Sequence, residues 1–312
     1  LKPEDDGIAA AKRIGYPVIV KAAAGGGGRG MRVAHNDMSL ANSMHLARRE
    51  AEAAFGDPSI YLEKYIEGAR HIEVQVLGDN FGNILHLGLR DCSLQRRHQK
   101  LIEESPPPGL SSKTQFEICR AAIKIASSVN YTNAGTVEFL VDRKGGYTFN
   151  EFNARLQVEH PVTEMVTGID LVKEQFRIAA GGRLPYRQKD IPFHGVSIEC
   201  RINAEDPEDG FRPCPGKIEF FSPPGGAGVR LDTHIYNGYK VPPQYDPLLA
   251  KLIVWGRNRE EAIAVMRRAL DEFIIEGIKT TIPLFRAIFG HSRFIEGKVD
   301  TSFLDDFFAG GK

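Results

Sequence analysis

The alternation of apolar and polar residues along the chain predicts a mixture of helices and strands. Short apolar segments rich in β-branched residues predict strands near residues 17–23, 31–34 and 59–65. Between the last two, the apolar positions of DMSLANSMHLARREAEAAFG recur with helical spacing and predict a helix over 37–55. HIEVQVLGD and ILHLGLRD alternate with period two, which is typical of strands.

The second half of the chain continues the mixed pattern. A helix is expected at about 112–129, and GTVEFLVDRKGGYTFNEFN predicts a hairpin. A further helix is expected from Val162 to about Ala180, where GGRLP ends it, and strand-rich sequence follows. The segments LLAKLIVWG and REEAIAVMRRALDEF predict a final strand and helix. We therefore expect an α+β protein with two regions, 1–190 and 191–312.

Composition and charge narrow the function. The chain has 312 residues, 42% of them hydrophobic, which suffices for a large core, and 40 basic side chains balance 40 acidic ones. This balance argues against nucleic acid or an anionic membrane as the main partner. No run of about 18 apolar residues is present to span a bilayer. The four cysteines form no CxxC pair, which favours a reduced, cytoplasmic protein.

The glycine run in KAAAGGGGRGM is a candidate phosphate loop. Gly25, Gly27 and Gly30 match the G-x-G-x-x-G pattern, but the predicted order is strand, loop, strand rather than strand, loop, helix. No Lys-Ser/Thr follows to make a Walker loop. We expect a hairpin tip whose backbone N–H groups approach phosphate oxygens closely. A surface hairpin without a ligand is the alternative.

The later hairpin brings oxygen ligands together. A two-residue turn at 144–145 places Glu138 opposite Glu151, whereas a turn at 145–146 places it opposite Asn153. In either case three oxygen-bearing side chains share one face. Two adjacent carboxylates repel each other unless a cation lies between them, so a hard divalent ion such as Mg²⁺ is predicted. A solvated face with a tolerated like-charge pair is the alternative.

Further polar residues follow the hairpin. If the alternation continues, Arg155, Gln157 and Glu159 extend from the metal site, and they offer a bidentate grip on a small planar oxyanion, an amide and a proton acceptor. An exposed loop of ordinary surface charges is the alternative. In RDCSLQRRHQK, an extended chain would place His98 and Lys100 on one face, although the composition without further context favours a solvated basic edge over a site.

These residues resemble the biotin carboxylase component of biotin-dependent carboxylases, a branch of the ATP-grasp superfamily. The segments that carry the resemblance are VIVKAAAGGGGRGMR, YLEKYIEGARHIEVQV, RDCSLQRRHQKLIEE, TVEFL, FNEFNARLQVEHPVTEMVTGIDLVKEQ, IECRINAEDP, YDPLLAKLIVWG and IIEGIKT. The resemblance implies an ATP-grasp domain over 1–190, with the glycine lid within about 1–66, and a biotin carboxylase C-terminal domain over 191–312. Because LKPEDDGIAAAKRIG resembles a helix entered within a longer protein, the family's N-terminal domain is expected to be absent.

The resemblance also implies residue roles. ATP is expected at Lys21, Gly26, Gly27, Gly28, Glu63, Lys64, Ile66, His71, Gln95 and His98. The Mg²⁺ or Mn²⁺ ligands are expected to be Glu138, Glu151 and Asn153. Bicarbonate is expected at Lys100, Arg155, Gln157, the backbone of Val158 and Glu159, and biotin at Arg201. The side chains implied in catalysis are those of Glu159, Arg155, Arg201 and Lys100.

The implied reaction is ATP-dependent carboxylation of biotin by bicarbonate through carboxyphosphate. The chain has no MKM-type biotinylation site, so the biotin is expected on a biotin carboxyl carrier protein. A carboxyltransferase, with acetyl-CoA as the favoured acceptor, and a homodimer are also expected. Two alternatives are another ATP-grasp ligase, which would lack the VEHPVTEM and ECRINAED pair, and a non-catalytic ATP-binding module, which would not need the catalytic side chains.

Overall fold

The computed structural model describes residues 6–24 and 31–310. The chain divides into two compact units, one formed by Leu1–Gly68 with Arg96–Gln99 and the other by Ala69–Gln95 with Lys100–Lys312. Each unit has hydrophobic core clusters of its own. The glycine run, which includes Gly26, Gly27 and Gly28, lies outside the described residues.

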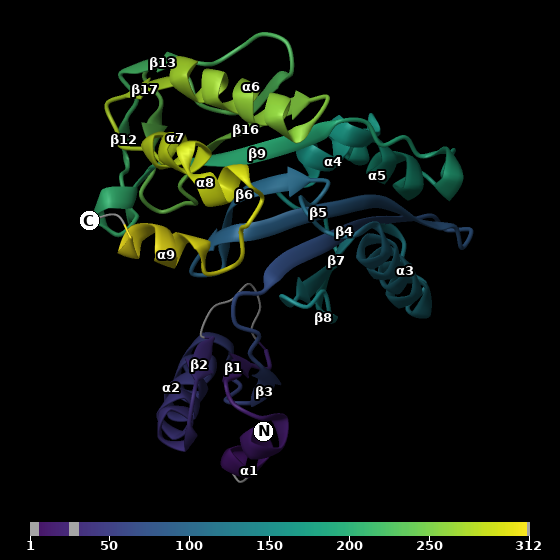
Figure 1. Ribbon diagram of the computed structural model, residues 1–312, viewed down its shortest axis with the longest axis vertical. Helices are drawn as coiled ribbons and strands as arrows, with labels where there is room; N and C mark the ends of the chain where they lie inside the picture. The colour runs from purple at the N-terminus through teal and green to yellow at the C-terminus, as the bar shows by residue number, and fades with distance from the viewer. Residues whose placement is uncertain (1–5, 25–30, 311–312) are drawn as a thin grey trace. The chain divides into compact units, whose positions relative to one another are not determined.

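The smaller unit is a three-stranded sheet packed against two helices (Figure 1). Its elements are α1 (Gly7–Ile14), β1 (Val18–Ala22), β2 (Arg32–Ala34), α2 (Asp37–Phe55) and β3 (Ile60–Lys64). The sheet order is β2-β1-β3, with both pairs antiparallel. Helix α2 begins at a capping box formed by Asn36 and Ser39 and ends at Gly56 in the left-handed conformation, which confirms the predicted bounds.

The larger unit is built on an eight-stranded sheet of order β14-β16-β9-β6-β5-β4-β7-β8. Its strands are β4 (Arg70–Gly78), β5 (Ile84–Arg96), β6 (Gln99–Ser105), β7 (Asn133–Val141), β8 (Tyr147–Asn153), β9 (Val196–Asn203), β14 (Val229–Thr233) and β16 (Leu248–Gly256). Strand β6 pairs antiparallel with β9, so residues before and after position 190 share one sheet. The α+β class predicted from the pattern is confirmed.

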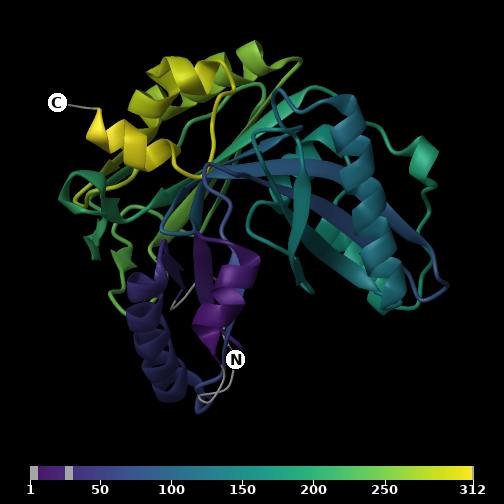
Figure 2. The ribbon, with the colours of Figure 1, turned by 60° about the horizontal axis from the view of Figure 1, so that its bottom comes forward.

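Helices cover both ends of this sheet. In Figures 1 and 2, α6 (Arg259–Glu272) and α7 (Ile282–Gly290) lie over β16 and β9, whereas α3 (Ser112–Ser128) lies against β4 and β7. The remaining helices are α4 (His160–Thr167), α5 (Leu171–Ala179), α8 (Ser292–Ile295), α9 (Phe303–Ala309) and the 3-10 turns Gln188–Asp190 and Pro207–Asp209. Among the described residues, no helix has the length and apolar character needed to cross a bilayer.

Short two-stranded sheets complete the C-terminal part. They pair β10 (Glu205–Asp206) with β11 (Arg212–Pro213), β12 (Gly216–Lys217) with β15 (Lys240–Val241), and β13 (Phe220–Ser222) with β17 (Ile274–Glu276). The predicted final strand and helix are β16 and α6.

Two sequence predictions are wrong in detail. The helix expected from Val162 to Ala180 is two helices, because Gly168 adopts the left-handed conformation (φ 68°) and ends α4. The extended RDCSLQRRHQK segment instead turns back on itself, because Arg97 and His98 both have positive φ (48° and 68°) between β5 and β6. His98 and Lys100 therefore do not lie along one strand.

Candidate active site

The β7–β8 hairpin brings Glu138 directly opposite Glu151, which is one of the two pairings expected. The turn is neither of the two expected. Asp142 N–H donates to Gly146 O (2.8 Å) and Gly145 N–H donates to Asp142 O (3.0 Å), so the loop has three residues, with Gly145 at φ 84°. A bulge after Glu138 shifts the register by one residue and so places Glu138 opposite Glu151.

Asn153 joins the two carboxylates of this hairpin. Its Nδ2 lies 3.0 Å from Glu138 Oε1 and 3.1 Å from Glu151 Oε1. If the Asn153 amide is turned over, its oxygen faces the same space as the two carboxylates. These oxygen atoms are the kind of ligands that a hard divalent cation prefers. Burial would raise the pKa of Glu138, but His71 and Lys100 outweigh it and hold that pKa well below its usual range. Glu138 is therefore ionised and available as a ligand.

A single ammonium group joins three buried carboxylates. Lys100 Nζ lies 2.5 Å from Glu73 Oε2, 2.6 Å from Glu159 Oε1 and 3.0 Å from Glu138 Oε1. Burial acts to lower the pKa of Lys100, but the carboxylates, Glu73 above all, raise it well above its ordinary value. Lys100 is therefore a permanent cation at the centre of the cluster.

A buried arginine supports the cluster from within the sheet. Arg90 is fully buried, and its Nε lies 2.5 Å from Glu73 Oε1. Its remaining N–H groups donate to Gln75, Thr136, Gln157 and Thr163. Neither Glu73 nor Arg90 was predicted as a site residue. The available signal was a charged residue inside each of the apolar strands HIEVQV and HLGLR, because an unpaired buried charge is too costly to keep.

Glu159 lies between two cations. Its Oε1 accepts from Lys100, and its Oε2 lies 2.8 Å from an NH2 of Arg201. Arg201 also donates through Nε to Glu103 Oε1 (2.7 Å), a residue that the sequence analysis missed. Burial would raise the pKa of Glu159, but Lys100 and Arg201 lower it well below its usual range. The carboxylate is therefore ionised and oriented at both oxygens.

The segment between β8 and α4 does not continue the strand alternation as predicted. Strand β8 ends at Asn153, and Arg155 is exposed, where it donates to Leu156 O and Asn153 Oδ1 (both 3.3 Å). Gln157, by contrast, is buried and donates to Glu138 Oε1 (2.9 Å). The structure therefore brings Gln157 into the buried cluster, whereas Arg155 is exposed and reaches the cluster through Asn153.

The backbone of Val158 is held by Lys251, which was not predicted. Lys251 Nζ donates to Val158 O (3.1 Å) and lies 3.5 Å from Asp232 Oδ2. This contact fixes the backbone next to Glu159 at the start of α4.

His71 belongs to the same polar network. Its Nε2 lies 2.8 Å from Glu138 Oε2, and its Nδ1 lies 2.7 Å from Gln95 Nε2. The backbone N–H of His71 donates to Ser93 Oγ (3.0 Å). Gln95 and His71 are thus brought together within the larger unit, whereas His98 belongs to the smaller unit.

In the smaller unit, Lys21 and Glu63 form an ion pair across β1 and β3. Lys64 instead donates to Gly15 O (3.0 Å) and Tyr16 O (2.7 Å), where it caps the carboxyl end of α1. Ile66 is half-buried. Lys21 and Glu63 are thus in contact, whereas the ammonium of Lys64 is hydrogen-bonded to backbone carbonyl groups.

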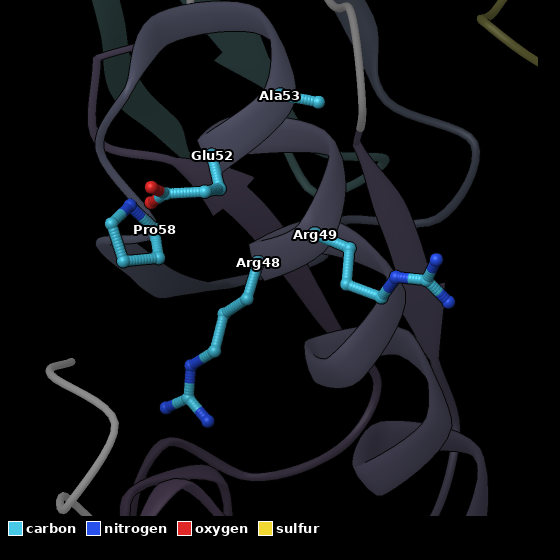
Figure 3. A pocket seen from close by; sticks show the side chains of 5 residues that line it. All are labelled: Arg48, Arg49, Glu52, Ala53 and Pro58. Atoms are coloured by element: carbon cyan, nitrogen blue, oxygen red, sulfur yellow. The ribbon is translucent and has the colours of Figure 1, made fainter.

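Two hollows lie outside these clusters. One of about 500 Å³ in the smaller unit is lined by Arg48, Arg49, Glu52, Ala53 and Pro58, and its two guanidinium groups point apart (Figure 3). The other, of about 440 Å³, is formed by α4, α5 and Arg230. Neither is lined by Lys100 or the carboxylates around it, so the candidate site is defined by the contacts of that cluster.

The fold and this site define a class, the ATP-dependent ligases of the ATP-grasp type. The family profile described as carbamoyl-phosphate synthase L chain, ATP binding domain, matches residues 1–187, and the profile described as biotin carboxylase C-terminal domain matches residues 199–306. The expected order of an ATP-grasp domain followed by a biotin carboxylase C-terminal domain is thereby confirmed. The second match disfavours other ATP-grasp ligases.

Relatives place the chain within that class. Biotin carboxylase 1 of Bacillus subtilis is 54% identical over 304 residues, which cover 97% of this chain and 68% of the relative. Biotin carboxylase of Pseudomonas aeruginosa is 52% identical over 305 residues, with 97% and 68% covered. The chain belongs to the biotin carboxylase family, and it is an ATP-dependent ligase.

Solved structures of biotin carboxylases resemble this chain over nearly its whole length. The biotin carboxylase domain of Hydrogenobacter thermophilus 2-oxoglutarate carboxylase, a dimer in complex with MgADP, ADP and bicarbonate, has a TM-score of 0.96 and 51% identity, and 98% of this chain and 68% of that chain are covered. Biotin carboxylase of Campylobacter jejuni, in a β,γ-ATP complex, has a TM-score of 0.92 and 52% identity, with 95% and 66% covered.

Proposed function

We propose that this chain transfers the carboxyl group of bicarbonate to biotin at the expense of ATP. The observation that carries the proposal is the position of Glu159, a buried carboxylate held by Lys100 on one oxygen and by Arg201 on the other. An ionised base flanked by two cations suits an anionic substrate, because the cations offset the charge of the substrate while the carboxylate accepts its proton. A non-catalytic ATP-binding module would not need this arrangement.

Glu159 is the proposed general base. Bicarbonate that binds beside it brings a second negative charge, which raises the pKa of Glu159 and strengthens it as a base. Glu159 then takes the bicarbonate proton while the bicarbonate oxygen attacks the γ-phosphorus of ATP. The bond from that phosphorus to the bridging oxygen breaks, and ADP and carboxyphosphate form. Lys100 and Gln157 orient the anion through N–H donors.

Arg201 serves the second half of the reaction. Carboxyphosphate breaks down to CO₂ and phosphate, and the phosphate removes the N1 proton of biotin. Arg201 stabilises the enolate oxygen that results, and N1 attacks CO₂ to form carboxybiotin. Because Arg201 contacts Glu159, the two steps share one set of residues. Arg155, exposed in this structure, and the Val158 backbone are proposed to complete the bicarbonate pocket.

The cofactor sites follow the predicted residues. Mg²⁺ or Mn²⁺ would be held by Glu138, Glu151 and Asn153, and it supplies neutralisation of the phosphate charge during transfer. The residues proposed for ATP are Lys21, Gly26, Gly27, Gly28, Glu63, Lys64, Ile66, His71, Gln95 and His98. The ion pair of Lys21 and Glu63 keeps that ammonium oriented.

The domain division and the partners are also proposals. An ATP-grasp domain over 1–190 and a biotin carboxylase C-terminal domain over 191–312 are supported by profile matches that leave 188–198 between them. The proposed partners are a biotin carboxyl carrier protein and a carboxyltransferase, with acetyl-CoA as acceptor, in the cytoplasm. A homodimer is supported by the dimer described for the Hydrogenobacter relative.

The test is ADP release by the full-length protein with Mg²⁺ and ATP, with and without bicarbonate and free biotin. We expect bicarbonate-dependent, biotin-stimulated release that falls about 100-fold or more in Glu159→Gln and Arg201→Ala. Glu296→Gln and Arg212→Ala, at exposed ion pairs, are the matched controls. If ATP binds but neither bicarbonate nor biotin changes ADP release, the proposal is wrong and the chain is a binding module.

A further inference from the structure

Two residues before Arg201, strand β9 carries a buried carboxyl group, that of Glu199, which has no role in the proposed reaction. Glu199 on β9 is directly opposite Glu103 on β6, and both are fully buried. Glu103 Oε1 accepts a hydrogen bond from Arg201 Nε (2.7 Å) and lies 2.6 Å from Arg201 Nη2. Among the described residues, no hydrogen-bond partner reaches Glu103 Oε2 or either carboxyl oxygen of Glu199. Three orphan oxygens therefore belong to two opposed side chains.

Two ionised carboxylates are not a stable solution for this pair. Opposed residues on paired strands have Cβ atoms about 5 Å apart, so their charges repel each other strongly in a buried setting. Arg201 pairs with Glu103 and Glu159, and within the described part of the chain no ion pair joins it to Glu199. A proton on one carboxyl creates an O–H donor that the other can accept, which satisfies two of the three orphan oxygens at once.

The surroundings decide which carboxyl holds that proton. Glu103 faces the guanidinium of Arg201, whereas the charges around Glu199 are those of Glu103, Lys251, Arg201 and Glu159. Burial and then the charge of Glu103 raise the pKa of Glu199 well above its ordinary value, and Lys251 and Arg201 only partly offset them. Burial also raises the pKa of Glu103, but Arg201 limits this to about 7. The proton therefore belongs on Glu199.

The elements packed around β9 supply the remaining titratable groups. Helix α4 packs on β9 and carries His160 and Glu164, and Glu164 is paired with Arg230 at 2.7 Å. Burial lowers the pKa of His160, which keeps that ring neutral. On β16, Ile253 is the residue directly opposite Glu199. None of these groups competes with Glu103 as the acceptor.

We infer that Glu199 is held as a neutral carboxylic acid, donates its proton in a hydrogen bond to Glu103 Oε2, and thereby positions Arg201 for its work on biotin. The inference rests on the proposed function, because it takes Arg201 to act at biotin. Glu199 is a positioning residue that acts through Glu103. Ionisation of Glu199 would push Glu103 away by repulsion and release one side of the Arg201 guanidinium.

The protonation of Glu199 is tested by infrared spectroscopy of the full-length protein in D₂O at pH 8. We expect a carboxylic acid C=O band that Glu199→Gln removes and Glu104→Gln retains. Glu104 is the matched control because it is also a buried glutamate. It lies on β6 next to Glu103 and is paired with Arg259 instead of Arg201. If the spectra of the wild type and Glu199→Gln show no difference in this band, Glu199 is ionised and the inference is wrong.

The positioning role is tested by the kinetics of biotin-stimulated ADP release. In Glu199→Gln, whose amide keeps a neutral donor, kcat/KM for biotin should stay within about twofold and extend to higher pH. In Glu199→Leu, which has no donor, it should fall about 10- to 100-fold, which is a larger fall than that of biotin-independent ADP release. Circular dichroism shows whether each variant is folded.

Two results would overturn the inference. They are a loss in Glu199→Gln as large as in Arg201→Ala, which would mean that a negative charge is needed, or unchanged biotin kinetics in a folded Glu199→Leu. If Arg201→Ala leaves biotin-stimulated ADP release intact, the proposed function is wrong. The infrared band tests the protonation of Glu199 independently of that result.

Discussion

At the scale of single residues, the site is governed by the pairing of buried charges. Glu73, Glu138 and Glu159 are all buried, and one ammonium serves all three. Removing one partner of such a cluster leaves uncompensated charge in a region of low dielectric. The charges that the chemistry uses are thus the same charges that the fold must neutralise.

The first prediction concerns Lys100. We expect Lys100→Met to destabilise the larger unit by about 3 kcal/mol, because three carboxylates lose their shared cation. Urea unfolding followed by the fluorescence of Trp255, the single tryptophan of the chain, measures this. Adding Glu73→Gln should recover part of the loss, since it removes one of the three negative charges.

The matched control for this prediction is Lys298→Met, at an exposed pair with Glu296. It should leave the unfolding midpoint unchanged. An equal midpoint for Lys100→Met and the wild type would show that the ammonium does not hold the cluster together.

At the scale of elements, the β7–β8 hairpin sets the metal face. The sequence left Glu151 and Asn153 as alternative partners of Glu138, and it predicted neither the three-residue turn nor the bulge that select Glu151. Turn length and bulge compensate for each other by one residue, and a pattern of alternation does not report such compensation. Gly145, at φ 84°, is the residue that permits this turn.

The second prediction therefore concerns Gly145. Gly145→Ala forces a side chain into the left-handed region without a steric clash, since the nearest atom to an added Cβ is 3.9 Å away. We expect a loss of about 1 kcal/mol in stability and a rise in the Mg²⁺ concentration needed for half-maximal ADP release. Mg²⁺ titration of ADP release measures the second effect.

Gly82→Ala is the matched control for the hairpin. Gly82 has φ 83° with nothing near an added Cβ, and it lies in the turn between β4 and β5. It should show a similar loss of stability with an unchanged Mg²⁺ requirement. A parallel change in the Mg²⁺ requirement of both variants would mean that the β7–β8 turn has no special link to the metal.

At the scale of the whole molecule, buried carboxyl groups act on stability in opposite directions. The pKa values of Glu138 and Glu159 are lowered, despite burial, by neighbouring cations, so their contribution is lost as the pH falls below the ordinary 4.5. Burial raises the pKa of Glu104 to about 7, with Arg259 only partly offsetting it. The folded chain then binds more protons than the unfolded chain between pH 4.5 and 7, and stability falls as the pH rises through this interval.

The third prediction follows from that sign. The unfolding free energy of the wild type should decrease between pH 4.5 and pH 7. In Glu104→Gln this decrease should be smaller by on the order of 3 kcal/mol, because one titrating group is removed. Urea unfolding by Trp255 fluorescence at successive pH values measures the slope. Glu117→Gln, at an exposed pair on α3, should leave the slope unchanged. An unaltered slope in Glu104→Gln would show that Glu104 remains ionised in the folded chain.

The sequence by itself determined most of the helices and strands and the family. The bounds of α2 and the succession of helices and strands along the chain follow from periodicity and capping, which are local in the chain. The family was evident from contiguous motifs for the same reason. The split of α4 and α5 at Gly168 was missed because a glycine in a helical pattern is compatible with both a break and a continuous helix.

Only the tertiary structure decided which charges meet. Arg90, Glu103, Glu199 and Lys251 come from separate strands, and their partners lie far away in the sequence. Strand order and register bring them together, and no local pattern encodes either. The same holds for the strand alternation that was expected to continue through Arg155, because β8 ends at Asn153 and Arg155 is exposed. Neighbouring residues fix secondary structure, whereas the pairing of buried charges is fixed by distant segments that must neutralise one another once water is excluded.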